Sequence, residues 1–352
     1  MRFAWHNLTL VPPLEKGLVR LLRRSRKRRI RFAALYLCVA IFVLIVLPWT
    51  LYSLFGKQEE IHIEGDTIRV QLLCHQNNEI IELGLEEYIV GVVAAEMPAA
   101  FPPEALKAQA IAARTYAVKR LQAPDPRIKE ISLQADLSTD PAINQAWIDN
   151  NEMKKRWGLT FYNTYRKKIA DAVLETRGRI LLYGGQLIDP VYHASCGGIG
   201  TENSGEVWKY DIPYLKAVPC SGHPEGNKEA TVVFKISELD RLLGTQLSAL
   251  PAAKRIGNSS LKINEKTASG RVKSVLFAGK TISGTDLRSK LGLRSTWFSW
   301  QLEKREVKFT TIGYGHGVGM CQYGAKALAL AGKKCEEILL HYYTGVTVGR
   351  LE

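Results

Sequence analysis

The alternation of apolar and polar residues predicts a β-hairpin at the start of a folded region. Residues 61–74, IHIEGDTIRVQLLC, alternate in the manner of a half-buried strand, and the polar stretch 75–79 predicts a turn. The segment IIEL at 80–83 is then expected to be the returning strand.

Helical spacing follows the hairpin. The segment EEYIVGVVAA at 86–95 repeats its apolar residues with the period of a helix, and three prolines between 98 and 103 separate it from a second helix over about 104–121. Proline in the first turn is a favourable helix start. Six alanines between 105 and 117 permit close packing of neighbouring helices against this second helix.

The next segments continue as a mixture of helices and strands. The stretch 123–150 is polar and interrupted by prolines, which predicts a surface excursion. We expect a helix over about 160–176 that ends at Gly178, followed by two short strands around Gly184 and Gly185.

Residues 230–300 are expected to form a β-rich supporting subdomain, because strands such as TVVF and SVLF alternate there with short helices such as SELDRLL and GTDLRSKL. A glycine-rich loop at 313–325 then leads into a helix through Leu330, and EEILLHYYTG predicts a last helix. The expected fold class is α+β.

An apolar run precedes the folded region. Residues 32–56 contain no Asp, Glu, Lys, Arg or His over 25 positions, and about 20 apolar residues suffice for a transmembrane helix. Residues 1–31 carry ten Lys or Arg against one Glu, which predicts a basic cytoplasmic tail and places residues 57–352 outside the cytoplasm. A cleaved signal peptide is the alternative, but its apolar core would be about 7–15 residues long and would end in small residues. We therefore expect an uncleaved anchor.

The formal net charge of +14 is concentrated in this tail. The tail contributes 10 − 1 = +9, which leaves +5 for the rest of the chain. The run RSRKRR lies beside an apolar span, so topology and contact with anionic lipid explain it better than nucleic-acid binding.

Glu96 is the first candidate for chemistry, because it lies alone in the apolar segment VVAAEMP. Apolar surroundings raise the pKa of a carboxyl group, as a general acid requires, whereas the alternative is a solvated glutamate at a helix end. On one continuous helix Glu87 would lie on nearly the opposite face and Glu86 about 15 Å away along the axis, so neither fits a second catalytic carboxylate. A lone acid is compatible with transglycosylation, in which a hydroxyl of the substrate replaces water as the nucleophile.

Arg114 lies among alanines in AQAIAARTYA and shares a helix face with Lys107. A guanidinium in this position requires either a carboxylate of the protein or an anionic or polar group of a substrate. Both possibilities are open at this point.

Two short motifs could bind zinc together. His193 and Cys196 form HxxC, and Cys220 and His223 form CxxH, which together provide four ligands for a tetrahedral site. The alternative is a Cys196–Cys220 disulfide, which we favour because disulfides persist outside the cytoplasm. Five cysteines lie beyond the apolar run, so at least one thiol there is unpaired.

Cys321 follows GHGVGM, and a thiolate at a helix N-terminus is stabilised. With His316, His193 or His341 it would form the nucleophile pair of a cell-wall peptidase. The alternative is a buried small thiol.

Four blocks of the sequence resemble the stage II sporulation protein D family. They occur in the expected order across nearly all of residues 57–352, and they are LEEYIVGVVAAEMPAAFPPEALKAQAIAARTYAVKR (85–120), VYHASCGGIGTENSGEVW (191–208), PYLKAV (213–218) and GYGHGVGMCQYGAKALA (313–329).

This resemblance implies a peptidoglycan lytic transglycosylase that cleaves between N-acetylmuramic acid and N-acetylglucosamine, leaves 1,6-anhydro ends and prefers strands without stem peptides. Glu96 occupies the position of the catalytic acid, and Arg114 corresponds to an arginine needed for activity. The expected cleft is formed by 80–215 and 311–345. The residues expected to bind substrate there are Lys107, His193, Ser195, His316, Gln322 and Tyr323.

Two departures from the family pattern matter. The glycine-rich block usually carries serine at the position of Cys321, which disfavours a thiol nucleophile. Some members bind zinc after the second helix, where this chain has Gln134 and no cysteine. The expectation is therefore no metal and no other cofactor.

The resemblance also implies a place at the septal and engulfing membranes of an endospore former, with an amidase and membrane proteins of the engulfment machinery as partners. Some relatives are described as amidase enhancers. A second hypothesis is therefore a non-enzymatic glycan-binding module that stimulates an amidase, although the intact AEMP glutamate favours an enzyme.

Overall fold

The computed structural model describes residues 32, 34–50, 66–208, 210–226, 229–251 and 260–351. The chain divides into two compact units, 1–60 and 61–352. In the first unit, residues 34–50 are helical and include a π-helical stretch, η1 (Phe42–Val46). Over the described ranges, no helix combines the length and the apolar character needed to cross a membrane. The expected tail 1–31 and positions 33 and 51–56 of the expected span lie outside the described residues.

The second unit begins with the expected hairpin. Strands β1 (Arg69–Cys74) and β2 (Glu79–Gly84) pair antiparallel, and β3 (Leu137–Ser138) adds to β1 in parallel. β2 runs directly into the helix α3 (Leu85–Glu96), whose first turn is held by a hydrogen bond from the Glu86 amide to Asp66 (2.6 Å).

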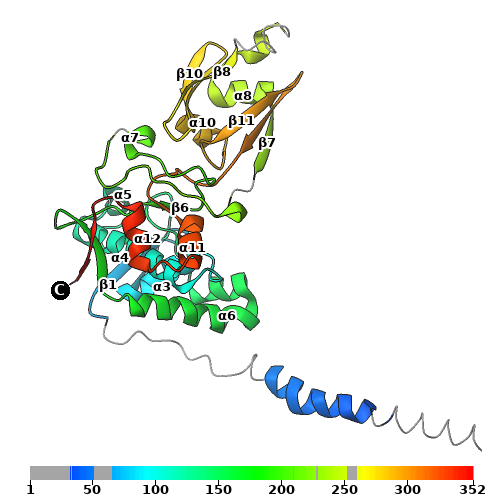
Figure 1. The fold of residues 1–352 in the computed structure, drawn as a ribbon, viewed down its shortest axis with the longest axis vertical. Helices are drawn as coiled ribbons and strands as arrows, with labels where there is room; N and C mark the ends of the chain where they lie inside the picture. The colour runs from blue at the N-terminus through cyan, green and yellow to red at the C-terminus, as the bar shows by residue number, and fades with distance from the viewer. Residues whose placement is uncertain are drawn as a thin grey trace, which may run out of the picture. The chain divides into compact units, whose positions relative to one another are not determined.

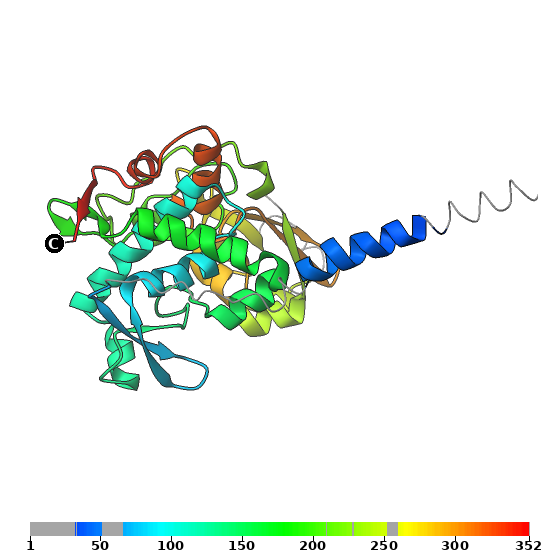
Figure 2. The same ribbon diagram turned by 90° about the horizontal axis from the view of Figure 1, so that it is seen from below.

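A group of helices builds the main core around α4 (Pro103–Gln122). Its alanines are fully buried, so neighbouring helices approach closely on several sides, as Figures 1 and 2 show for α3 and α6. The predicted helices at 86–95 and 104–121 are confirmed. The helices of this core are α3 (Leu85–Glu96), α4 (Pro103–Gln122), α6 (Asn150–Glu175), α11 (Gln322–Leu330) and α12 (Cys335–Tyr342).

α6 begins about ten residues earlier than the sequence predicted. Asp149 caps its start by accepting a hydrogen bond from the Glu152 amide (2.7 Å). Gly158 interrupts it with a left-handed backbone (φ 67°, ψ 165°), which glycine adopts without strain. This kink breaks the helical period, so the first segment was not recognisable as part of the helix.

The prediction of a surface excursion at 123–150 is wrong in part. The segment contains α5 (Pro126–Ile131) and β3, and Leu137 and Ser138 are buried. Its polar groups pair internally, as in the hydrogen bond from the Ser138 amide to Asn144 Oδ1 (2.8 Å). A polar segment can thus be buried when its own side chains satisfy its backbone.

Two small sheets join distant parts of the chain. β4 (Arg179–Tyr183) pairs with β5 (Gln186–Leu187), as expected, and also with β14 (Thr347–Arg350). β6 (Tyr192–His193) and β13 (Met320–Cys321) pair in parallel, which brings the two blocks at 191–208 and 313–329 together.

Residues 230–311 contain a second hydrophobic core of their own. Among the described residues of this region, two three-stranded sheets, with strand orders β11-β12-β7 and β10-β9-β8, form it together with two α-helices (Figure 1). The elements are β7 (Ala230–Lys235), α8 (Ile236–Leu243), β8 (Leu261–Lys266), β9 (Val272–Phe277), β10 (Lys280–Ser283), α10 (Gly284–Lys290), β11 (Phe298–Leu302) and β12 (Glu306–Thr311). The remaining short elements are α7 (Ser204–Val207), η2 (Pro224–Gly226) and η3 (Leu247–Ala249).

Candidate active site

Glu96 is the last residue of α3, and it lies beside the segment that contains Ala146. Its Oε1 accepts a hydrogen bond from the Ala146 amide (3.0 Å). The last carbonyls of α3 have no partner within the helix, and Arg156 Nη1 donates to two of them, those of Ala94 (2.9 Å) and Ala95 (3.1 Å). A guanidinium therefore lies beside the Glu96 carboxyl group.

Glu96 lines a pocket of about 380 Å³. Arg156, Trp157 and Tyr165 of α6 also line it, and the Trp157 and Tyr165 rings meet edge to face at 5.7 Å. Among the described residues of the pocket lining, Glu96 is the only carboxylate. The pocket thus combines a single acid with two aromatic side chains.

The surroundings raise the pKa of Glu96 above its usual value. Burial is the main cause and outweighs the opposite effects of the Ala146 amide and of hydrogen bonds from the Gln322 and Tyr192 side chains. The carboxyl group therefore keeps its proton to a higher pH than a free glutamate does, as a general acid requires.

Gln322 and Tyr192 connect the distant sequence blocks to Glu96. Gln322, the first residue of α11, is buried, and its Nε2 donates to Gln109 Oε1 of α4 (3.3 Å). Tyr192 of β6 accepts a hydrogen bond from Gln145 Nε2 (2.9 Å). The expected residue Gln322 is therefore brought to the acid.

His316 and His193 pack on each other with ring centroids 5.5 Å apart. His316 Nε2 donates to the Tyr192 carbonyl (3.0 Å), and its Nδ1 accepts from the Val318 amide (3.1 Å). Burial and the neighbouring His193 lower the pKa of His316 to about 3, so this ring is neutral at physiological pH. His193 Nδ1 donates to the Val318 carbonyl (3.1 Å), and burial lowers the pKa of this ring also. Through these hydrogen bonds, both rings connect the segment of β6 to the loop before β13.

Arg114 is fully buried, and its partner is a carboxylate of the protein. Its Nε and Nη2 donate to the two oxygens of Glu86 (2.8 and 2.6 Å), and the guanidinium also donates to the carbonyls of Val173 and Arg179. Glu86 lies in the first turn of α3, whereas Glu96 ends that helix. Arg114 therefore has a structural position, and its expected contribution to activity stays a prediction.

The other expected substrate-binding residues have varied positions. Lys107 pairs with Glu104 (3.1 Å) and with Glu175, and it does not line the Glu96 pocket. Ser195 is buried and exchanges backbone hydrogen bonds with Tyr314. Tyr323 packs edge to face on Phe101, with ring centroids 5.2 Å apart.

Cys321 does not pair with any of the three histidines expected for a peptidase. Its side chain is fully buried, and the histidine nearest to its sulfur is His223 (Nε2 at 3.9 Å). His341 Nε2 donates instead to the Pro219 carbonyl (2.8 Å). A buried thiol of this kind cannot reach a peptide substrate, so the structure disfavours the peptidase.

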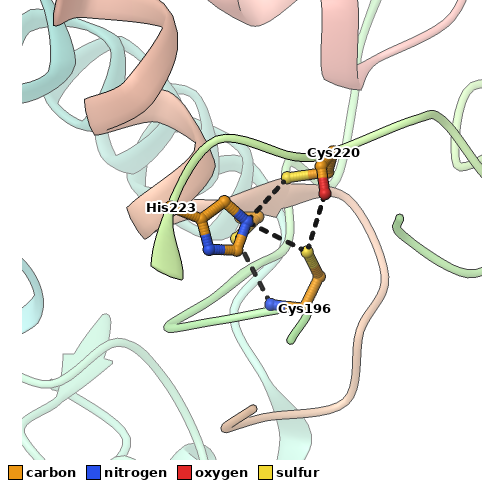
Figure 3. A group of neighbouring side chains, drawn as sticks. Cys196, Cys220 and His223 are labelled. Atoms are coloured by element: carbon orange, nitrogen blue, oxygen red, sulfur yellow. Dashed lines mark hydrogen bonds between the residues drawn. The ribbon is translucent and has the colours of Figure 1, made fainter. Parts of the chain in front are cut away.

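The expected Cys196–Cys220 disulfide is not formed. All cysteines of the described ranges are free thiols, and Cys196, Cys220 and Cys321 gather around His223 (Figure 3). The four possible zinc ligands suggested by the sequence included His193. In the structure, Cys321 takes the place of His193 in this group.

A wider pocket, of about 990 Å³, lies near α7 and is lined by Trp208, Lys273 and Thr296 among others. Glu206 also lines it, and this carboxylate is paired with Lys273 (3.1 Å). Neither Glu96 nor its hydrogen-bonding partners belong to this pocket, so we place the chemistry at the smaller one.

The sequence did not identify several residues around Glu96. Ala146 contributes only its backbone, so no side-chain pattern could indicate it. The aromatic run WGLTFYNTY at 157–165 could have indicated Trp157 and Tyr165 as the aromatic lining of a pocket, and Arg156 directly precedes it.

Comparisons with known proteins give consistent results. A family profile described as Stage II sporulation protein matches residues 74–183. Stage II sporulation protein D of Bacillus subtilis (strain 168) is 40% identical over 82% of this chain and 81% of its own length, and that of Bacillus amyloliquefaciens is 36% identical over 84% and 83%. The amidase enhancer of Bacillus subtilis (strain 168) is 27% identical over 73% of this chain and 40% of its own length.

Proposed function

Since the chain belongs to the stage II sporulation protein D family, we propose that it is a peptidoglycan lytic transglycosylase that acts during sporulation. The observation that carries this proposal is the lone carboxylate of Glu96, with a raised pKa, in a pocket lined by aromatic side chains. The substrate would be the bond between N-acetylmuramic acid and N-acetylglucosamine in strands without stem peptides.

The chemistry requires only one acid. Protonated Glu96 donates its proton to the glycosidic oxygen as the bond from this oxygen to the muramic acid C1 breaks. The C6 hydroxyl of the same sugar then attacks C1, and the Glu96 carboxylate takes the hydroxyl proton. No water is consumed, the product carries a 1,6-anhydro ring, and Glu96 returns to its protonated form. A second carboxylate, which hydrolysis would normally use, is not needed.

The neighbours of Glu96 can assist this reaction. The Ala146 amide and the Gln322 and Tyr192 side chains stabilise the carboxylate that forms after proton transfer. Trp157 and Tyr165 offer apolar ring faces for the sugar, and Arg156 offers donors to its polar or anionic groups.

We expect the protein to act at the outer face of the septal membrane and, later, of the engulfing membrane. The uncharged run at 32–56 and the ten basic residues before it support a single-pass anchor with a cytoplasmic N-terminus. The proposed partners are glycan strands, a cell-wall amidase and membrane proteins of the engulfment machinery.

The similarity to an amidase enhancer supports a second candidate function, a glycan-binding module that stimulates a partner amidase without cleaving glycan. The same pocket would serve as the binding site. In this case Glu96 would bind a sugar and would transfer no proton.

Product analysis distinguishes these functions. The full-length chain, purified in detergent, is incubated with denuded glycan strands, and the products are identified by mass spectrometry. We expect anhydro ends, which make each product lighter by one water molecule than the corresponding hydrolysis product. Reducing ends would rule out the transglycosylase and require a second carboxylate. Intact strands, together with stimulation of an added amidase, would establish the binding module instead.

A further inference from the structure

Three thiols and one imidazole converge on one buried point. Cys196, Cys220, His223 and Cys321 offer four ligand atoms that lie within 4.8 Å of one another, and none of the four residues is more than 6% exposed. They come from three separate segments: the loop after β6, the loop that leads to η2, and the junction of β13 with α11. Figure 3 shows Cys196 and Cys220 directed towards the His223 ring.

We propose that these four residues form a structural zinc site with three cysteine ligands and one histidine ligand. The distances from the imidazole nitrogen to the three sulfur atoms are close to those of tetrahedral coordination. With Zn–S bonds of about 2.3 Å and a Zn–N bond of about 2.0 Å, a sulfur and the nitrogen should lie about 3.5 Å apart. The observed distances from His223 Nε2 are 3.3 Å to Cys196 Sγ, 3.3 Å to Cys220 Sγ and 3.9 Å to Cys321 Sγ.

Hydrogen bonding alone does not account for this arrangement. One imidazole nitrogen can make a single good hydrogen bond, yet three sulfur atoms surround His223 Nε2. The other ring nitrogen, Nδ1, is buried and has no hydrogen-bond partner among the described residues. The contacts of the His223 side chain that the structure shows are therefore made by Nε2. A metal ion bound there would contact this nitrogen and the three sulfur atoms at once.

Hydrogen-bond donors also surround the sulfur atoms, as is typical of cysteine thiolates that bind a metal. The amides of Cys196 and Gly324 lie 3.3 Å from Cys321 Sγ, and the Gly198 amide lies 3.4 Å from Cys196 Sγ; each N–H donates to the sulfur. Tyr342 Oη lies 3.1 Å from Cys220 Sγ. Such donors stabilise the negative charge that a cysteine carries when it binds zinc.

Arg271 adds a positive charge beside the same loop. This buried guanidinium comes from the second core, and its Nη2 donates to the carbonyls of Cys196 and Gly200, both at 2.8 Å. Arg271 also pairs with the buried carboxylate of Glu202 (3.7 Å), so its main effect on the site is to fix the loop that carries Cys196. Four protein ligands leave no open position for substrate, so the site is structural rather than catalytic.

The site connects directly to the Glu96 pocket. Cys321 immediately precedes Gln322, whose side chain forms a hydrogen bond with Glu96. Zinc bound here would hold the start of α11, and with it Gln322, in place. This role does not depend on the reaction that Glu96 performs.

Metal content of the full-length chain tests the proposal. The protein is purified in detergent without metal-affinity resin and under mild reducing conditions, and its zinc is measured by elemental analysis. We expect one zinc per chain, and X-ray absorption should find three sulfur neighbours at about 2.3 Å and one nitrogen neighbour at about 2.0 Å. Because this measurement uses the unmodified protein, it remains decisive even if the variants fail to fold.

Variants locate the metal. Cys196→Ser and His223→Ala should each lower the zinc content well below one equivalent. Cys335→Ser changes a buried cysteine outside the cluster and should keep the full content. Zinc that persists in both cluster variants would place the metal elsewhere and overturn the proposal. A protein without zinc would overturn it too, as would non-reducing peptide mapping that finds Cys196 bonded to Cys220.

Discussion

Glu86 and Arg114 join the first turn of α3 to the middle of α4 through two hydrogen bonds in a fully buried pair. Removing one member of such a pair leaves an uncompensated charge in the interior, which typically costs about 3–5 kcal/mol. An arginine in this position is therefore expected to be necessary for activity even when it never contacts a substrate.

A double variant separates these two roles of Arg114. Arg114→Met alone should lower the free energy of unfolding by about 3–5 kcal/mol, because it leaves the Glu86 carboxylate unpaired. Adding Glu86→Leu should recover part of this loss, and glycan cleavage per folded molecule should recover with it. Thermal unfolding and cleavage assays on both variants measure this. A double variant that folds well yet cleaves nothing would show that Arg114 takes part in the reaction.

Because the pKa of Glu96 is raised, we expect the stability of the folded protein to depend on pH through this group. The folded protein binds the Glu96 proton more tightly than the unfolded chain does, so this group contributes stability at low pH, which is lost as pH rises through the folded-state pKa. Glu96→Gln does not ionise. It should therefore raise the melting temperature most above the folded-state pKa, and the difference should shrink below a pH of about 4.3, the ordinary glutamate pKa.

Glu87→Gln is the matched control for this measurement, since Glu87 is an exposed glutamate on the same helix. It should change the melting temperature little at any pH. Equal effects of both variants across the pH range would contradict the assignment of a raised pKa to Glu96.

At the scale of elements, the sequence predicted α3 and α4 to within two residues at each end. Their apolar spacing is regular, and prolines mark the break between them. The start of α6 was not predictable because Gly158 interrupts the helical period. The segment at 137–148 was misjudged because its polarity suggested exposure, whereas its side chains satisfy its own backbone and its Ala146 amide reaches Glu96.

Gly91 shows how the segment at 137–148 depends on α3. A Cβ atom on Gly91 would lie 2.1 Å from Trp147 Nε1, which is far closer than any real contact. Gly91→Ala should therefore displace Trp147 and, with it, the neighbouring Ala146 amide. Overpacking of this kind typically lowers the free energy of unfolding by about 1–3 kcal/mol. The rate of glycan cleavage per folded molecule should also fall, because the Ala146 amide would no longer be correctly placed beside Glu96.

A second substitution tests this explanation. Trp147→Leu shortens the side chain, so adding it to Gly91→Ala should restore stability relative to Gly91→Ala alone, as coupling between contacting residues requires. Thermal unfolding of the two single variants and the double variant completes the cycle. Additive losses would mean that Gly91 and Trp147 do not interact as the structure indicates.

At the scale of the whole molecule, the sequence blocks at 85–120, 191–208 and 313–329 meet through α4, β6 and β13, whereas a shared cleft formed by 80–215 and 311–345 stays a prediction. The grouping of four metal-binding side chains could not be predicted from spacing alone. HxxC and CxxH suggested His193 as a ligand, whereas the parallel pairing of β6 with β13 supplies Cys321 from 125 residues further along the chain.

The proposed membrane anchor makes a prediction about the full-length chain in cells. The intact chain should sediment with membranes, and a variant that lacks residues 1–56 should appear in the soluble fraction while it still cleaves denuded glycan. Fractionation followed by immunoblotting measures this. An intact chain found mainly in the soluble fraction would contradict the anchor.

The proposed role of Glu96 as general acid predicts that Glu96→Gln loses most of its rate of glycan cleavage. Glutamine keeps the shape and hydrogen bonding of the side chain but cannot donate the proton, so kcat/KM should fall by about 10²- to 10⁴-fold while glycan binding persists. Glu87→Gln, assayed on the same denuded strands, should cleave at the unmodified rate. Cleavage by Glu96→Gln at the rate of the unmodified protein would show that Glu96 is not the general acid.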